Sequence, residues 1–86
     1  MGKLIFTDRA WNEYLYWQQQ DKKTLKRINS LLKDIDRGSF EGIGKPEPLK
    51  NHEGFWSRRI DDYNRLVYQV SDGQTEIIQC RGHYDD

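Results

Sequence analysis

The stretch FWSRRIDDYNRLVYQVSDGQTEIIQCR, residues 55–81, carries the pattern that decides the fold. Runs rich in β-branched and aromatic residues predict three strands, over residues 55–61, 65–70 and 75–81. Ser71-Asp72-Gly73-Gln74 is a hairpin turn signal, because Asp-Gly readily adopts the positive φ angles that such turns need. Asp61-Asp62-Tyr63-Asn64 is the preceding turn. Short turns between successive runs predict antiparallel pairing.

The residues before this stretch predict one short strand and two helices. Residues 3–7 form the strand, and Thr7 or Asp8 offers an N-cap for a helix that begins at once. This helix carries aromatic and aliphatic residues at i, i+3, i+4 spacing. Asp21 offers a second N-cap, and the next helix repeats one apolar stripe until Gly38 stops it. Two adjacent helices with a tight joint predict a helical hairpin.

The element order β-α-α-β-β-β predicts an α+β fold, with two N-terminal helices packed on one face of a twisted, mainly antiparallel sheet. A chain of 86 residues suffices for one small domain, so we expect residues 1–86 to form a single unit. Residues 38–54 hold four of the seven glycines and both prolines, and no helical or strand period survives there. We expect a long loop in this region, and such loops are often functional.

Composition excludes several classes of protein. No apolar run approaches the ~18 residues of a membrane-spanning helix, and the apolar run after Lys3 is too short for a signal peptide. The single cysteine, Cys80, allows no internal disulfide, and these features together favour the cytoplasm. The 14 basic and 14 acidic residues cancel, which argues against an indiscriminate nucleic-acid binder but allows a local cationic site.

Strand alternation separates the side chains of the sheet into two faces. The apolar face, which the helices should cover, contains Trp56, Ile60, Leu66, Tyr68, Val70, Ile78 and Cys80. Arg58 is the one misfit on this face, and we expect its charged end to extend to an edge. The polar face contains Ser57, Arg59, Arg65, Gln69, Gln79, Arg81 and His83, interrupted by Phe55, Val67 and Ile77.

The polar face gathers three arginines and a histidine with no acidic residue among them. Like charges repel, and the arginine fork matches phosphate, so the cluster favours an anion site; a solvated sheet surface is the alternative. Two prolines hold Glu47 on stiff backbone within Lys45-Pro-Glu-Pro-Leu-Lys50. If this loop folds over the cationic face, Glu47 joins a set suited to acid–base chemistry on a phosphodiester. Otherwise, Glu47 is a solvated residue in a rigid turn.

Motifs for nucleotides and metals are incomplete. Gly42-Ile43-Gly44 begins like a dinucleotide-binding loop, but Glu47 stands where the third glycine belongs. His52 and His83 lie far apart in sequence, and no cysteine cluster supports them. We therefore expect neither a metal nor a cofactor.

Four segments in one order carry a resemblance to a known family: Gly44-Lys-Pro-Glu-Pro-Leu-Lys50, Gly54-Phe-Trp-Ser-Arg-Arg-Ile60, Arg65-Leu-Val-Tyr68 and His83-Tyr84. Together with the aromatic run 11–17, they resemble the YoeB toxins of YoeB–YefM toxin–antitoxin pairs, in the RelE-like superfamily. The likeness covers essentially the whole chain, and the combination is more specific than any one segment. It implies a microbial RNase (RelE-like) fold and an mRNA interferase, an endoribonuclease that cleaves the codon in the ribosomal A site.

The resemblance also implies a role for each site residue. Glu47 matches the general base that takes the proton of the ribose 2′-hydroxyl, Arg65 the cation that stabilises the phosphorane, and His83 the general acid for the leaving 5′-oxygen. The supporting cations and the terminal aromatic that orients RNA are Lys50, Arg59 and Tyr84. RNA carries its own nucleophile, so this chemistry requires no metal.

The partners implied are the 70S ribosome with its mRNA and a YefM-like antitoxin. Toxin dimers occur in the family, so a homodimer is among the assemblies that the resemblance allows, and no membrane partner is expected.

Two alternative functions remain open at this point. A superfamily member can bind and block a target without cleaving RNA, as ParE-like toxins do. A degenerate toxin can persist as an antitoxin-binding partner and corepressor. Asp85-Asp86 follow the His-Tyr pair with which relatives often end, and Gly82 replaces a commonly larger residue. Those carboxylates would favour protonated His83 or repel phosphate, and the glycine would loosen the C-terminal segment.

Overall fold

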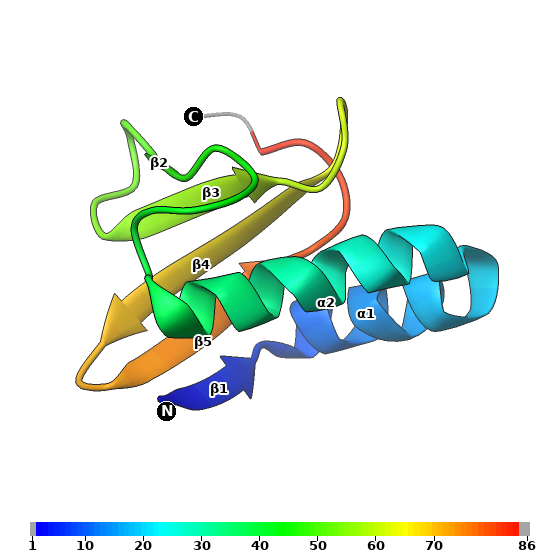
Figure 1. The fold of residues 1–86 in the computed structure, drawn as a ribbon, viewed down its shortest axis with the longest axis horizontal. Helices are drawn as coiled ribbons and strands as arrows, with labels where there is room; N and C mark the ends of the chain where they lie inside the picture. Colours follow the sequence, from blue (N-terminus) through cyan, green and yellow to red (C-terminus); the bar gives the residue numbers. More distant parts are fainter. Residues whose placement is uncertain (1, 85–86) are drawn as a thin grey trace.

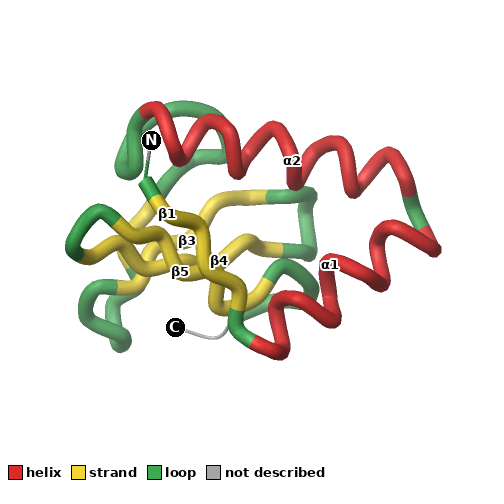
Figure 2. The backbone as a smooth tube through the Cα atoms, turned by 90° about the horizontal axis from the view of Figure 1, so that it is seen from below, coloured by secondary structure: helices red, strands yellow, loops and turns green. Residues whose placement is uncertain are grey.

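The computed structural model of the protein describes residues 2–84. Its elements are β1 (Lys3–Phe6), α1 (Asp8–Gln20), α2 (Lys22–Arg37), β2 (Glu47–Pro48), β3 (Phe55–Arg59), β4 (Arg65–Ser71) and β5 (Gln74–Gln79). The strands form one sheet in the order β1-β5-β4-β3-β2. Only the β1–β5 pair in that sheet is parallel, while the other three pairs are antiparallel. Both helices lie on one face of the sheet, which confirms the predicted α+β architecture (Figures 1 and 2).

The helices begin and join where the predicted capping residues stand. Thr7 Oγ1 accepts the N–H of Ala10 at 3.0 Å and caps α1. Asp21 closes one helix and opens the next, because its N–H donates to Trp17 while its carboxylate accepts two N–H groups of α2. Gly38 ends α2 with φ −156°, an extended conformation rather than the left-handed one typical of a glycine stop. The helical hairpin is therefore confirmed (Figure 2).

The core lies between the helices and the covered face of the sheet. Its buried residues are Ala10, Trp17, Ile28, Leu31, Ile35, Ile60, Leu66, Tyr68, Ile77 and Cys80. One expected assignment was wrong, since Ile77 is fully buried whereas Ile78 is only half-buried. Tyr68 pairs with Ile77 but the preceding residue Val67 pairs with Gln79, so Ile78 is an extra residue in β5. Because of this bulge, the side chains of β5 before residue 78 point to the faces opposite to those that strict alternation predicts.

Arg58 does not extend to an edge, as the sequence had suggested, but is completely buried. Its guanidinium donates to Asp34 Oδ2 at 2.6 Å and to the hydroxyl oxygen of Tyr68 at 3.2 Å. The same group donates to the carbonyl oxygens of Gly38, Ser39, Glu41 and Ile43. The loop after α2 is thus wrapped around one arginine, which satisfies carbonyls that no regular element would satisfy.

The expected loop over residues 38–54 contains β2, a two-residue strand that the sequence pattern did not predict. Gly44 brings the loop close to the sheet: its φ is +79°, and its carbonyl accepts the N–H of Arg59 at 2.7 Å. A Cβ at Gly44 would press against Leu31 and the backbone of Arg59, so this glycine allows a close approach that other residues prevent. The loop then joins the sheet as its edge strand.

Neither helix within residues 2–84 combines the length and apolar character needed to cross a membrane.

Candidate active site on the open face of the sheet

The open face is the side of the sheet that the helices leave uncovered, and the strand register arranges its side chains in rows. Residues that pair directly across neighbouring strands point to the same face, and here they form three rows. The middle row crosses four strands and contains Glu47, Ser57, Val67 and Gln79. Arg59 pairs with Arg65 in the next row. The row on the other side contains Phe55, Gln69 and Glu76. Successive rows are about 7 Å apart along the strands.

Glu47 lies on the exposed edge strand β2, opposite Ser57. Of the two arrangements that the sequence left open, neither a loop folded over the cationic face nor a plain surface turn is found. The loop extends the sheet instead, so that Glu47 shares the open face with Arg59 and Arg65. Glu47 stands two strands away from Arg65, about 10 Å across the sheet at the usual strand spacing. This separation leaves room for a ligand between the carboxylate and the guanidinium.

Arg65 is held by the turn that precedes it. Its Nη1 donates to the carbonyl oxygens of Asp61, at 2.8 Å, and Asn64, at 3.3 Å. The turn itself is closed by the Asp61 carboxylate, which accepts the N–H groups of Tyr63 and Asn64. Burial raises the pKa of Asp61, but the hydrogen bonds from Asn64 and Tyr63 outweigh it and hold the pKa below its ordinary value. Arg65 is therefore fixed through one nitrogen and keeps its other N–H groups for a ligand.

His83 is brought to the same corner by backbone hydrogen bonds. Arg65 N–H donates to the carbonyl oxygen of Gly82 at 3.0 Å, and Gly82 N–H donates to Asn64 Oδ1 at 2.7 Å. The His83 ring lies against Tyr63, with Nδ1 at 3.3 Å from its carbonyl oxygen. A carbonyl oxygen can only accept a hydrogen bond, so this contact requires a proton on Nδ1. The other ring nitrogen, Nε2, is not used in this contact.

Gly82, for which the sequence suggested a looser segment, has a defined backbone conformation in the structure. Its φ is +93°, a left-handed conformation that favours glycine, and both of its backbone polar groups are bonded. Asp85-Asp86, to which the sequence assigned an effect on His83, lie outside the described residues.

The two remaining predicted residues lie toward the other end of the face. Tyr84 packs edge-on against His52, with ring centroids 5.1 Å apart, and His52 stacks on Phe55 at 5.8 Å. Lys50 lies in the turn between β2 and β3, beyond the Phe55 row. The register thus gives Glu47, Arg59 and Arg65 one face, the contacts of Gly82 and His83 bring His83 to the Arg65 corner, and Lys50 and Tyr84 lie toward the other end.

Sequence reasoning missed the residues that hold the C-terminal segment. Gln79 was placed on the polar surface, but it is fully buried, and its Nε2 donates to the carbonyl of Gly82 at 3.3 Å. Helix α1 holds Cys80, the residue after Gln79, through two hydrogen bonds: Trp17 Nε1 donates to the Cys80 carbonyl at 2.8 Å, and Glu13 accepts the Cys80 N–H at 2.9 Å. The spacing of these residues in sequence, more than 60 positions, gives no signal of these contacts.

Arg59 and Arg65 on the open face form no ion pair within residues 2–84. The ion pairs in this part of the chain are Arg9–Glu13, Arg37–Asp34 and Arg58–Asp34. Arg59 and Arg65 are therefore available to pair with an anionic ligand. Across the described ranges, no group of three His, Cys, Asp or Glu side chains has the arrangement of a metal site.

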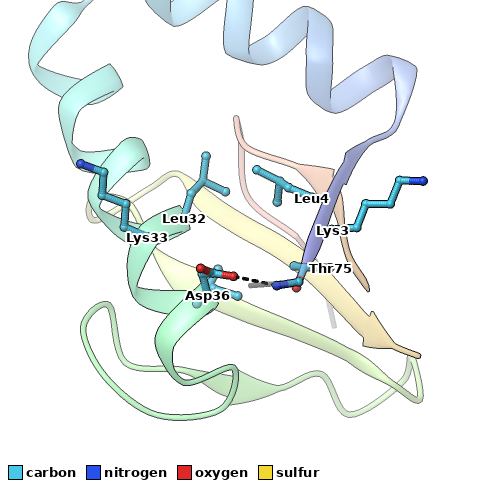
Figure 3. Close-up of a pocket in the computed structure, with 8 residues that line it drawn as sticks. Lys3, Leu4, Leu32, Lys33, Asp36 and Thr75 are labelled. Carbon is cyan, nitrogen blue, oxygen red and sulfur yellow. Dashed lines mark hydrogen bonds between the residues drawn. The ribbon is translucent and has the colours of Figure 1, made fainter. Parts of the chain in front are cut away.

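A separate apolar cleft of about 190 Å³ lies between β1 and the C-terminal half of α2 (Figure 3). Leu4 and Leu32 line it, and the Gly2 N–H donates to Asp36 at its rim at 3.3 Å. It involves neither the open face nor any predicted site residue.

Residues 6–84 match the family of YoeB-like toxins of bacterial type II toxin-antitoxin systems. The chain belongs to this family. It is 57% identical to toxin YoeB of Escherichia coli K12, over 95% of the chain and 99% of the relative. It is 58% identical to toxin YoeB of Synechocystis, over 95% of the chain and 96% of the relative.

Solved structures of YoeB proteins share the fold. The YoeB/ParE toxin from Agrobacterium tumefaciens superposes with a TM-score of 0.93 at 46% identity, covering 95% of this chain and 99% of that one. The YoeB dimer from Staphylococcus aureus gives 0.89 at 51% identity, covering 95% and 97%. The resemblance stated from sequence motifs and the expected fold are confirmed.

Proposed function

We propose that this member of the YoeB-like toxins is an endoribonuclease that cleaves mRNA in the ribosomal A site. Glu47 would remove the proton from the ribose 2′-hydroxyl, and the 2′-oxygen would attack the adjacent phosphorus. His83 would give a proton to the 5′-oxygen as the P–O5′ bond breaks. The products are a 2′,3′-cyclic phosphate and a 5′-hydroxyl, and no redox step or external nucleophile is needed.

The observation that carries this proposal is the register, which gives Glu47, Arg59 and Arg65 a common face. The Arg65–Gly82 hydrogen bond brings the His83 segment to the same corner. A base and an acid must act on opposite sides of the scissile linkage, and Glu47 comes from the edge strand β2 whereas His83 comes from the segment that follows β5.

The cations have the role of stabilising charge that grows in the transition state. Arg65 has free N–H groups on the side away from its turn, and Arg59 stands directly opposite it on β3. Preorganised donors of this kind typically contribute on the order of 10²–10³ in rate. Lys50 would support the phosphate chain, and Tyr84 would orient the RNA.

The relatives suggest the protein partners. Solved structures include a heterotetrameric YoeB–YefM toxin-antitoxin complex and a YoeB dimer, both from Staphylococcus aureus. We infer that a YefM-like antitoxin binds this chain and that the chain can form a homodimer. Arg59 and Arg65, which form no ion pair within the described part of the chain, fit an antitoxin segment rich in carboxylates.

Purified ribosomes programmed with a defined mRNA test the proposal. The wild type should produce cuts within the A-site codon, with the RNA ends described above. Glu47→Gln and His83→Gln should each lower the single-turnover rate on the order of 10²–10⁴-fold with an unchanged thermal midpoint. Glu53→Gln, in the exposed turn before β3, is the matched control and should cleave like the wild type.

The same experiment separates the alternatives. Translation blocked without cut RNA would support a toxin that only binds its target. Inactivity of the wild type, with tight binding of the antitoxin, would support a degenerate toxin. Either result would overturn the nuclease proposal.

A further inference from the structure

Arg81 lies at the end of β5, where the chain leaves the sheet beside α1, and its guanidinium is stacked on an aromatic ring. The Cζ atom is 3.7 Å from the ring centroid of Tyr16, while the arginine as a whole is exposed. We propose that Arg81 binds an RNA phosphate next to the scissile one and that Tyr16 is its positioning residue. This inference rests on the proposed function and extends its substrate-binding site onto α1.

The stacking arrangement suits phosphate recognition. A guanidinium stacks through its flat face and donates hydrogen bonds through its edge, so the Tyr16 contact leaves the donors of Arg81 accessible. The ring also restricts a side chain that would otherwise lose considerable rotamer freedom on binding. Tyr16 itself is supported by an edge-on contact with Trp17, at 5.1 Å between centroids.

Hydrogen bonds hold the residues on both sides of Arg81 in the chain. Cys80 is held by Trp17 and Glu13, and Gly82 is held by Asn64 and by the N–H of Arg65. The guanidinium therefore has a defined position relative to the corner formed by Arg65 and His83.

The charge of Arg81 is unpaired within residues 2–84. The carboxylate that contacts this segment belongs to Glu13, and its other oxygen pairs with Arg9 at 2.9 Å. Arg81 is thus a preorganised cation whose neighbouring acid already has a partner, and an RNA phosphate would supply the missing charge.

The location of Arg81 indicates a neighbouring phosphate rather than the reacting one. Two residues of backbone span at most about 7 Å, so Arg81 is close to His83 along the chain. Its side chain, however, stacks on Tyr16 of α1, in the helix layer, and not beside Arg59 and Arg65 on the open face. Binding there would hold the RNA in register without touching the reacting atoms, and it should affect KM rather than kcat.

A structural role is the competing explanation, because the stack could simply fix the C-terminal segment. Arg81→Met separates the two roles, since the methionine chain still packs on Tyr16 but carries no charge. We expect Arg81→Met to raise KM for A-site cleavage about tenfold with kcat unchanged, and Arg81→Lys to restore part of the loss. Tyr16→Phe should match the wild type, whereas Tyr16→Leu should raise KM. Lys33→Gln, which removes one charge beside the α2–β1 cleft, is the control and should leave KM unchanged (Figure 3).

Salt dependence gives a second readout that a structural role would not move. Affinity for ribosomes carrying an mRNA with 2′-deoxy substitution at the cleavage position can be measured without any cutting. Arg81→Met should reduce the slope of log affinity against log salt by about 0.7, the value for one lost phosphate contact on a single strand. This binding measurement stays informative even if the wild type fails to cleave, so failure of the nuclease proposal and failure of this one are distinguishable.

Two results would overturn the inference. One is an Arg81→Met protein with wild-type KM and an unchanged salt slope. The other is a parallel fall in kcat and thermal midpoint at unchanged KM, which would show that Arg81 only stabilises the segment.

Discussion

Arg58 and Arg59 are consecutive residues of β3, and the sheet directs them to opposite faces. Arg58 is fully buried, with Asp34 and Tyr68 as side-chain partners, on the face that the helices cover. Arg59 is exposed on the open face, and its guanidinium makes no hydrogen bond within residues 2–84. The same side chain serves the fold in one position and remains available for a ligand in the next.

The difference shows how this small protein separates stability from chemistry. All partners of the buried arginine are supplied by the chain, and they include the carbonyls of the loop that leads to β2. Loss of Arg58 should therefore damage the fold first, whereas loss of Arg59 should damage function first.

The largest effect is expected at Arg58. Arg58→Met should lower the free energy of unfolding by about 3–5 kcal/mol, because it leaves a carboxylate and several carbonyls without their donor. Urea unfolding followed by tryptophan fluorescence measures this change. A loss no larger than that in Arg59→Met would contradict the assigned division of roles.

Arg59→Met should have the opposite profile. We expect its free energy of unfolding to stay within about 0.5 kcal/mol of the wild type. The single-turnover rate on programmed ribosomes should fall on the order of 10²-fold, since one preorganised cation is lost. Normal cleavage by this variant would remove Arg59 from the site.

Acid should destabilise the buried cluster. The N–H of Ile43 and then the guanidinium of Arg58 hold the pKa of Asp34 below its ordinary value of 3.8. Its stabilising contribution is therefore complete above the unfolded pKa and is lost as pH falls through the lower folded value. Unfolding measured between pH 7 and 3 should show a shallower acid decline in Asp34→Asn than in the wild type. Equal slopes would mean that Asp34 is not coupled to folding.

The smallest effect concerns Cys80, on the covered side of the chain between Gln79 and Arg81. Burial raises the pKa of its thiol to about 12, with the nearby Glu13 adding to the shift. Because the thiolate is the reactive form, a disulfide reagent at pH 8 should modify the native protein far more slowly than the urea-unfolded protein. Comparable modification rates in the native and unfolded protein would show that the Cys80 thiol is accessible to solvent in the native state.

The parts of the fold that were predictable are those with local signals. Thr7, Asp21 and the Asp72-Gly73 turn fix element boundaries through hydrogen bonds between near neighbours, so their positions could be predicted. The two-residue strand β2 has no such signal, because pairing with β3 alone defines it. The exchange of Ile77 and Ile78 has the same origin, since the bulge exists only in the register between β4 and β5.

The candidate site divides in the same way. Strand alternation grouped Arg59 with Arg65, the flanking prolines and the family resemblance added Glu47, and the register gives all three one face. The residues that support the site were not predictable, because Trp17, Glu13 and Gln79 act through contacts that only the fold creates. Arg58 was read as a misfit because no pattern in the chain reveals that a distant loop would surround it.

The parallel pairing of β1 with β5 has a consequence for how the molecule is made. Strand β1 (Lys3–Phe6) pairs with β5, about 70 residues later in the chain, so the first strand to be synthesised can pair only after the last one. Such distant pairing raises contact order and slows folding. A nascent chain must therefore be almost fully synthesised before β1 can pair and the sheet can close.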